Sequence, residues 1–325
     1  MRFMIAILVL AAPLAGAASL EENFSTEPVG NGWRILGQSN LFQWNASNHN
    51  LQVTWDSSRP NSAFYYLLGT ILNRSDDFGL ALDLRLESST GGVNPNKPST
   101  FQLSFGFFNI DDLSGTNFSR GSGHNSPNLV EFNFYPDTGF GPTIWPAIWS
   151  TNSQPNYNGP DDYTILDLPV GVLMHVTMNY SASNQTVTTT ITTNGVSVGD
   201  IHSVALSPSF TDFHAGAFGI ESYSDEGQDP QYGGSLFATG VVSKVQISFP
   251  DPPVGNVSGR FEGGVWQVQF ASRTNWLYTL ERTVDLQSWL AVSQSTSGTG
   301  TTLTLLDSSG VLSTAAYRVR AERRP

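Results

Sequence analysis

The segment Ser126–Trp149, SPNLVEFNFYPDTGFGPTIWPAIW, determines how the rest of the chain is interpreted. It opens with a residue-by-residue alternation of apolar and polar side chains, which is the period of a β-strand with two different faces. The apolar members are Val130, Phe132 and Phe134, and the polar members are Glu131, Asn133 and Tyr135. Pro136 ends this pattern, and we expect a proline-rich loop after it that carries Trp145 and Trp149.

The same two-residue period recurs along most of the chain, and no amphipathic helix is evident. Residues 80–87, 101–107 and 174–180 alternate in this way, and a Thr-rich segment runs from Gln185 to Thr193. That segment ends at Asn194-Gly195, a pair that favours a type I′ hairpin turn because both residues tolerate positive φ. Many half-polar strands separated by turns predict an all-β sandwich or jelly roll.

A proline-rich segment, Phe249–Gly255, predicts a domain boundary, because three prolines in four residues cannot continue a central strand. We therefore expect a jelly roll over residues 19–249, a linker over 250–255 and a small sandwich over 256–325. The strands expected in that sandwich are Val265–Phe270, Leu277–Arg282, Trp289–Val292, Thr301–Leu306 and Ala316–Arg320.

The first 18 residues have the pattern of a secretory signal peptide. Arg2 precedes the apolar run Met4–Leu14, and Ala15-Gly16-Ala17 supplies a small-residue cleavage site. An uncleaved anchor is the alternative, although the run is too short to span a bilayer. We expect a secreted protein, extracellular or periplasmic, with no membrane insertion. The absence of cysteine excludes thiol chemistry and favours a bacterial exported protein.

The charge is strongly negative and unevenly distributed. The formal net charge is -12, and the residues from Val254 onward carry seven Arg against five acidic residues, a net of +2. The preceding part therefore carries -14, which argues against nucleic acid or anionic membranes as partners. Neutral glycans or cations fit this charge better.

Several segments resemble the concanavalin A-like (laminin-G-like) jelly-roll superfamily over roughly residues 20–249. They are Glu22–Phe24, Trp33, Trp44, Leu51–Val53, Asp77–Asp83, His175–Tyr180, Thr193–Gly195 and Phe237–Ile247. The tail, through Tyr278–Trp289 and Tyr317–Arg320, resembles fibronectin-III-like modules of exported proteins from Verrucomicrobia-like bacteria. The superfamily includes lectins, adhesive modules, glucanases and polysaccharide lyases, so the resemblance alone does not choose a function.

Two kinds of catalysis are testable on these residues. Retaining glucanases of this fold share a Glu-x-Asp-x-x-Glu strand, because they need two carboxylates about 5–5.5 Å apart. Glu131 matches the first position, but Asn133 and Pro136 occupy the other two, so we do not expect a glucanase. A lyase needs a Tyr or His base and a partner for the uronate carboxylate. It stays open if one polar face carries Arg85, Gln102, Asn133, Tyr135 and His175.

We therefore expect a secreted, non-catalytic carbohydrate-binding protein whose partner is a polysaccharide or other glycan. Aromatic rings stack on sugar rings, and acids and amides bond to hydroxyls. The predicted ligand-binding residues are Arg120, Asn125, Glu131, Asn133, Tyr135, Trp145 and Trp149. Alternatively, the tryptophans plug the core, and the polar residues form a solvated face or loop turns. The alternative functions are a structural or adhesive module, or a polysaccharide lyase or hydrolase of unrecognised mechanism.

Calcium is the one cofactor that the resemblance implies, because jelly rolls of this superfamily frequently bind it. The candidate oxygen clusters are Asp111-Asp112, Asp161-Asp162 and Asp225–Asp229. None has the spacing of a diagnostic calcium loop, and solvated acidic loops are the alternative.

Overall fold

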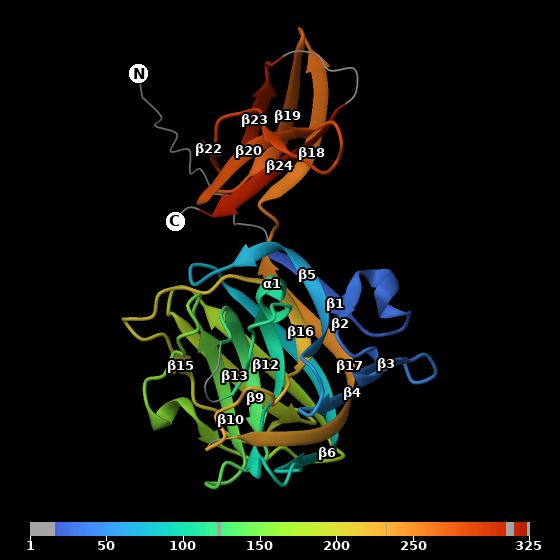
Figure 1. The fold of residues 1–325 in the computed structure, drawn as a ribbon, viewed down its shortest axis with the longest axis vertical. Helices are drawn as coiled ribbons and strands as arrows, with labels where there is room; N and C mark the ends of the chain where they lie inside the picture. The colour runs from blue at the N-terminus through green and yellow to red at the C-terminus, as the bar shows by residue number, and fades with distance from the viewer. Residues whose placement is uncertain (1–16, 122–124, 232, 310–314, 324–325) are drawn as a thin grey trace, which may run out of the picture. The chain divides into compact units, whose positions relative to one another are not determined.

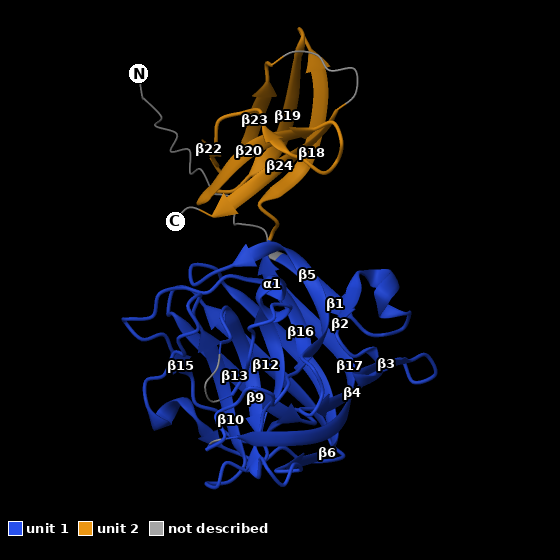
Figure 2. Ribbon diagram, viewed as in Figure 1, with its two compact units in different colours: residues 1–250 blue, residues 251–325 orange. Residues whose placement is uncertain are grey.

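A computed structural model of the chain describes residues 17–121, 125–231, 233–309 and 315–323 (Figure 1). The chain forms two compact units, Met1–Pro250 and Asp251–Pro325, which are coloured separately in Figure 2. Most of the signal peptide expected over residues 1–18 lies outside the described residues. Both units are built from β-strands, so the expected all-β class is confirmed.

The larger unit contains a ten-stranded sheet with the strand order β14-β13-β12-β6-β17-β4-β3, in which β1 and β7 also pair with β17 and β15 pairs with β13. Its long central strands are β6 and β17, which pair over most of their length. The strands are β1 (Ala17–Glu22), β3 (Phe42–Asn45), β4 (Asn50–Asp56), β6 (Phe78–Gly91), β7 (Ser99–Thr100), β12 (Leu173–Ser181), β13 (Thr186–Thr193), β14 (Val196–Ser197), β15 (Val204–Ala205) and β17 (Gly234–Pro250).

A seven-stranded sheet with the order β11-β10-β9-β8-β16-β5-β2 forms the second layer of this unit. All of its pairings are antiparallel. The strands are β2 (Trp33–Leu36), β5 (Ser62–Leu72), β8 (Leu103–Phe108), β9 (Leu129–Tyr135), β10 (Thr143–Trp149), β11 (Thr164–Ile165) and β16 (Ala215–Ser222).

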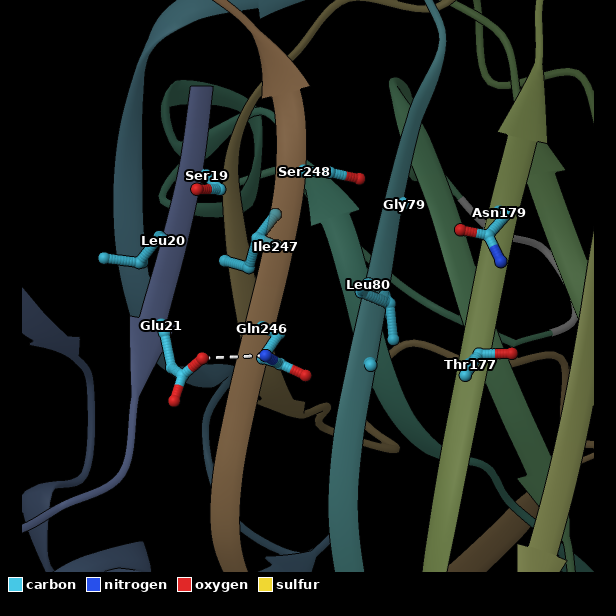
Figure 3. A pocket seen from close by; sticks show the side chains of 11 residues that line it. Ser19, Leu20, Glu21, Gly79, Leu80, Thr177, Asn179, Gln246, Ile247 and Ser248 are labelled. Atoms are coloured by element: carbon cyan, nitrogen blue, oxygen red, sulfur yellow. Dashed lines mark hydrogen bonds between the residues drawn. The ribbon is translucent and has the colours of Figure 1, made fainter. Parts of the chain in front are cut away.

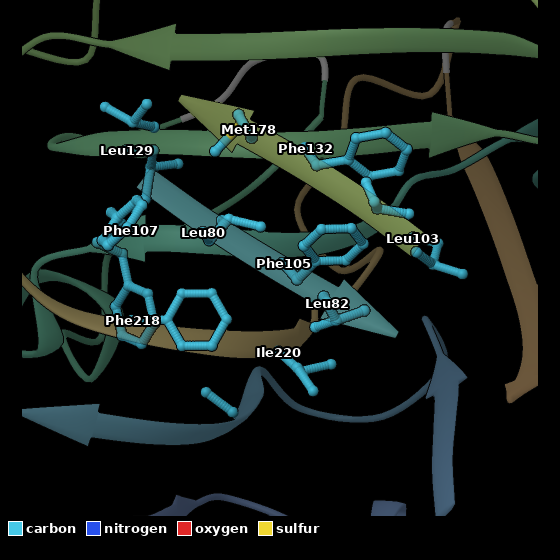
Figure 4. Close-up of a cluster of buried hydrophobic side chains, with 14 of the residues drawn as sticks. Leu80, Leu82, Leu103, Phe105, Phe107, Leu129, Phe132, Met178, Phe218 and Ile220 are labelled. Atoms are coloured by element: carbon cyan, nitrogen blue, oxygen red, sulfur yellow. The ribbon is translucent and has the colours of Figure 1, made fainter. Parts of the chain in front are cut away.

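The hydrophobic core lies between these two sheets (Figure 4). Phe105 on β8 stacks on Phe132 on β9 with ring centroids 4.7 Å apart. Phe78 on β6 meets Phe107 on β8 edge to face at 4.9 Å, which joins the two sheets. This arrangement confirms the predicted jelly-roll-type sandwich, because the apolar side of each alternating strand faces the opposite sheet.

Helices are few and short in the described residues. They are α1 (Ile110–Leu113) and the 3-10 turns η1 (Pro28–Asn31), η2 (Ser39–Leu41) and η3 (Pro160–Asp162). Asn194 and Gly195 have φ values of 50° and 78° and join β13 to β14 in a two-residue turn. The predicted hairpin turn is therefore confirmed.

The seven-stranded sheet is buried on both faces at its centre, and this feature positions the site described below. All six residues of β8 and all seven of β10 are buried, although β8 alternates between phenylalanine and small or polar residues on its two sides. The face turned away from the core carries Ser104, Gly106, Glu131, Asn133 and Glu221, which are opposite one another in the β8, β9 and β16 ladders. Side chains and loops cover this face, so it does not meet solvent as a typical outer sheet face does.

The loop expected to carry Trp145 and Trp149 is instead strand β10, and that prediction was wrong. The prolines of this segment suggested a loop, since a proline cannot donate to a β-ladder. At Pro146, however, β10 pairs only with β9, because β11 contacts β10 at Thr143 and Ile144 alone. A proline is tolerated in a strand with a partner on one side.

The smaller unit contains a three-stranded sheet, β18-β19-β23, and a four-stranded sheet in which β20 pairs with β21, β22 and β24. The strands are β18 (Val254–Glu262), β19 (Val265–Ser272), β20 (Trp276–Thr283), β21 (Leu290–Ala291), β22 (Thr296–Ser297), β23 (Thr302–Asp307) and β24 (Ala316–Arg323). The sequence did not indicate β18, because none of its residues is buried and it lacks an apolar side. Tyr278 donates a hydrogen bond to the Pro253 carbonyl at 2.7 Å, which fixes the start of this unit.

Phe132 and Phe140 provide a matched test of this core, because the first is fully buried and the second is 88% exposed. We expect Phe132→Ala to lower the free energy of unfolding by about 3–5 kcal/mol, through lost burial and a cavity. Phe140→Ala should change it by less than about 0.5 kcal/mol. Urea unfolding of both variants measures this difference, and equal effects would contradict the proposed core.

Candidate functional site

Aromatic side chains surround a pocket of about 390 Å³ beside strands β9 and β10. We call it the aromatic pocket. Its lining residues are Thr100, Phe101, Gln102, Arg120, Gly121, Tyr135, Trp145, Trp149, Pro155, Tyr157, Tyr163 and Gln228. They come from β7, β9, β10 and four connecting segments, so the pocket depends on the fold rather than on one local motif.

The aromatic rings of the pocket contact one another in sequence. The centroids of Trp145 and Trp149 are 6.1 Å apart, and those of Trp145 and Tyr163 are 5.1 Å apart. Tyr157, which is 53% exposed, lies 5.8 Å from Tyr163. The ring surface therefore extends from two largely buried tryptophans to an exposed tyrosine at the rim.

A buried ion pair lies beside the pocket. Arg120 Nη2 donates to Glu131 Oε2 at 2.8 Å, and both side chains are at most 2% exposed. The guanidinium also lies 5.1 Å from the Trp149 ring centroid and 5.4 Å from that of Tyr223, within range of cation–π attraction.

Polar neighbours hold the two sides of this ion pair. Tyr223 donates a hydrogen bond to Glu131 Oε1. Asn133 Oδ1 accepts from Ser104 Oγ at 2.5 Å and from Arg120 Nη2 at 3.4 Å. Gly106 lies opposite Glu131 on the neighbouring strand, and a Cβ there would come within 2.4 Å of the Val130 carbonyl oxygen. Only glycine therefore lets β8 pass this close to the buried glutamate.

The loop that carries Arg120 is closed at its base by backbone hydrogen bonds. Ser119 and Asn125 exchange two of them, each 3.0 Å long. The Asn125 amide also donates to the Asn117 carbonyl at 3.0 Å. Asn125 therefore acts on the pocket through the loop, and it is not among the residues that line the pocket.

Glu221 is a second buried carboxyl group on the same sheet face, and the sequence analysis missed it. It is fully buried, and neither of its oxygens has a hydrogen-bond partner among the described residues. Burial and the charge of Glu131 raise its pKa well above the ordinary value, so it favours the protonated form. The alternation of Phe218 and Ile220 with Gly219 and Glu221 was the signal that could have found it.

Burial also keeps the pocket phenols protonated. It raises the pKa of Tyr135 well above its ordinary value, and it raises that of Tyr163 to about 12. Both hydroxyl groups are therefore hydrogen-bond donors at neutral pH.

The structure separates the predicted ligand-binding residues into two groups, apart from Asn125, which bonds to Asn117 within its loop and does not line the pocket. Arg120, Tyr135, Trp145 and Trp149 line the aromatic pocket, and both indoles are also packed into the core. Glu131 and Asn133 have no exposed surface and lie under Arg120 rather than in an open groove.

The residues considered for a lyase do not share one face. Arg85 on β6 and His175 on β12 belong to the ten-stranded sheet, where His175 Nδ1 pairs with Asp83 at 2.6 Å. Gln102 and Tyr135 lie at the aromatic pocket in the other layer. The condition that kept a lyase open, one polar face carrying all five residues, is therefore not met; the sequence did not indicate which sheet each strand joins.

The acidic clusters considered for calcium have protein partners. Asp112 accepts from Asn128 at 2.7 Å, Asp162 accepts from the Asn158 backbone N–H at 2.6 Å, and Asp225 pairs with Lys97 at 2.7 Å. Within the described ranges, no three His, Cys, Asp or Glu side chains are grouped to hold a metal ion.

A second depression, of about 320 Å³, lies on the outer face of the ten-stranded sheet (Figure 3). It crosses β1, β17, β6 and β12 at Gly79, with small polar side chains around it. Glu21 accepts a hydrogen bond from Gln246 at 2.7 Å across this surface. It has no aromatic ring, so the aromatic pocket is the stronger candidate site.

No protein-family model matches the chain, and no curated protein matches it. Several solved structures resemble 72% of it, including the lectin UEA-II complexed with galactose at 13% identity, 98% coverage of that chain and a TM-score of 0.46. Peanut lectin with a nine-residue peptide has 14% identity, 98% coverage and a TM-score of 0.45. A mutant of the alginate lyase Aly36B with an alginate tetrasaccharide has 16% identity, 96% coverage and a TM-score of 0.36. We draw no ligand or activity from matches this distant.

Among the described residues, no helix is long and apolar enough to cross a membrane.

Glu221→Gln tests the buried carboxyl group. A raised pKa in the folded state means that the carboxyl group stabilises the fold most below its unfolded value near 4.5, and that this contribution is lost as the pH rises toward the folded pKa. The stability of the wild type relative to Glu221→Gln should therefore fall between pH 4.5 and pH 8, by at most about 1.4 kcal/mol per pH unit. Thermal unfolding across this range measures it, and parallel curves would contradict the assignment.

Proposed function

We propose that this protein binds carbohydrate without turning it over, and that the sugar occupies the aromatic pocket. The observation that carries the proposal is a set of six aromatic side chains around one pocket with polar groups between them: Phe101, Tyr135, Trp145, Trp149, Tyr157 and Tyr163. Aromatic rings offer apolar faces to the C–H groups of a sugar ring, and the polar groups orient its hydroxyls. The mostly buried rings of Trp145 and Trp149 are held in place by the core, which limits the entropy lost on binding.

Two features favour binding over catalysis. Glu131 is engaged by Arg120 and Tyr223, and neither it nor Glu221 lines the aromatic pocket. A glycosidase needs two carboxyl groups that reach the glycosidic bond. Tyr135 does line the pocket, but its raised pKa makes it a poor general base for a lyase.

The wider context of the proposal comes from the sequence. The pattern of residues 1–18 supports secretion, and the absence of cysteine supports a bacterial source. The charge of -14 before Val254 supports a glycan rather than nucleic acid as the partner. We assign the second unit to the fibronectin-III-like modules, a proposal supported by its two small sheets of three and four strands.

Tyr157→Ala and Trp145→Ala test the aromatic pocket. Removing one stacking ring should weaken glycan binding about 10-fold, because such a contact contributes up to about 1.5 kcal/mol. A broad glycan array identifies the ligand, and calorimetry on the best glycan measures the loss. Tyr157→Ala is the cleaner variant, since this residue is 53% exposed and contributes little to the core.

Trp289→Ala is the matched control, because this tryptophan belongs to the second unit and packs against Arg318. It should leave the affinity unchanged. Unchanged binding by both pocket variants with the fold intact would locate the ligand elsewhere. If no glycan on the array binds and no polysaccharide is cleaved, the carbohydrate proposal is wrong, and an adhesive or structural module becomes the better hypothesis.

A further inference from the structure

We propose that the aromatic pocket selects an acidic glycan, and that it recognises the carboxylate of a uronic acid unit. The inference rests on the proposed carbohydrate binding and specifies the class of sugar. It depends on the charge and the hydrogen-bond donors of Arg120 and Gln102, which are separate from the stacking rings.

The first argument is the charge of the lining. Arg120 is the single charged side chain among the twelve described residues that line the pocket, and no Asp or Glu lines it. The chain has 27 acidic residues against 15 basic ones, so a lining with one cation and no anion departs from the character of the whole protein.

The second argument is the set of unused donors. Arg120 uses Nη2 for Glu131 and Asn133, whereas its buried Nε has no hydrogen-bond partner among the described residues. The Gln102 side-chain amide nitrogen is likewise buried without a partner in the described part of the chain. These side chains are 1% and 3% exposed, respectively. Unmet buried donors cost free energy, so a ligand that supplies acceptors gains by meeting them.

A carboxylate fits this donor set better than a hydroxyl group does. It only accepts hydrogen bonds, and it carries the charge opposite to that of Arg120. Tyr135 adds a protonated phenol to the same lining. Glu131 pairs with Arg120 Nη2 and does not line the pocket, so it acts as a positioning residue rather than a ligand contact.

The negative charge of the whole protein does not oppose this local recognition. At physiological salt, exposed charges more than about 8 Å away are largely screened. Arg120 is buried, and attraction across a few ångströms in such a site is screened much less. We expect the distant charge to slow association and the pocket to determine affinity.

The experiment compares matched sugars on the full-length secreted protein. The probes are tetrasaccharides of galacturonic, mannuronic and guluronic acid, each before and after reduction of its carboxyl groups to alcohols, and a sulfated galactan tetrasaccharide. Calorimetry measures each affinity. We expect at least one uronide to bind 10-fold or more tightly than its reduced form.

Gln102→Glu tests the pocket itself, because it replaces a donor with an anion of nearly the same shape. It should weaken the uronide at least 10-fold and leave the reduced sugar within about 3-fold. Gln102→Met removes the donor without adding charge and should have a smaller effect in the same direction. Gln43→Glu is the matched control, since Gln43 is exposed on β3 of the other sheet and makes the same change in net charge. Thermal unfolding checks that every variant is folded.

The outcomes separate this inference from the proposed function. Equal binding of a uronide and its reduced form overturns the inference and leaves carbohydrate binding in place. Preference for the sulfated sugar alone overturns the assignment to a carboxylate. A uronide preference that Gln102→Glu does not change places recognition outside the aromatic pocket and also overturns it. Failure of every probe, acidic and reduced, together with an empty glycan array, counts against carbohydrate binding itself.

Discussion

The arrangement of the larger unit depends on the burial of the Arg120–Glu131 pair against the outer face of the seven-stranded sheet. An ion pair in such a place survives because each charge has its partner, and losing one partner typically costs about 3–5 kcal/mol. Tyr223, Asn133 and Trp149 then surround the guanidinium. The ion pair therefore holds the loop of Arg120 against β9. The same contacts fix Arg120 and Trp149, which line the aromatic pocket.

A sheet that is packed on both faces performs two different tasks at once. Toward the core, β8 and β9 contribute phenylalanines that stack on each other at 4.7 Å. On the opposite side, the same strands hold charges and amides in a fixed geometry. The packed core face therefore holds the polar side chains of the opposite face in place. Precise recognition of a small polar ligand requires such fixed side chains.

Local patterns predicted the strands well and the environment of the site poorly. Alternation in β9 correctly placed Glu131, Asn133 and Tyr135 on one face, because that property depends only on neighbouring residues. The burial of Glu131 depends on Arg120 from an earlier loop and on Tyr223, which lies 92 residues later. Two strands were not predicted, for different reasons. The prolines of the segment that forms β10 suggested a loop, and β18 has no apolar side. The sequence carried no signal for these long-range contacts.

The strict alternation along β9 also bears on how the protein avoids misfolding. If β9 paired one residue out of register with β8, Glu131 would enter the aromatic core and Phe132 would face Arg120. Such a state loses the ring stacking and leaves two charges buried without partners, so neither face tolerates it. A sandwich with one solvated face would penalise the same slip on one side only. The two-sided burial of this sheet therefore disfavours a β9–β8 pairing shifted by one residue during folding, independent of any ligand.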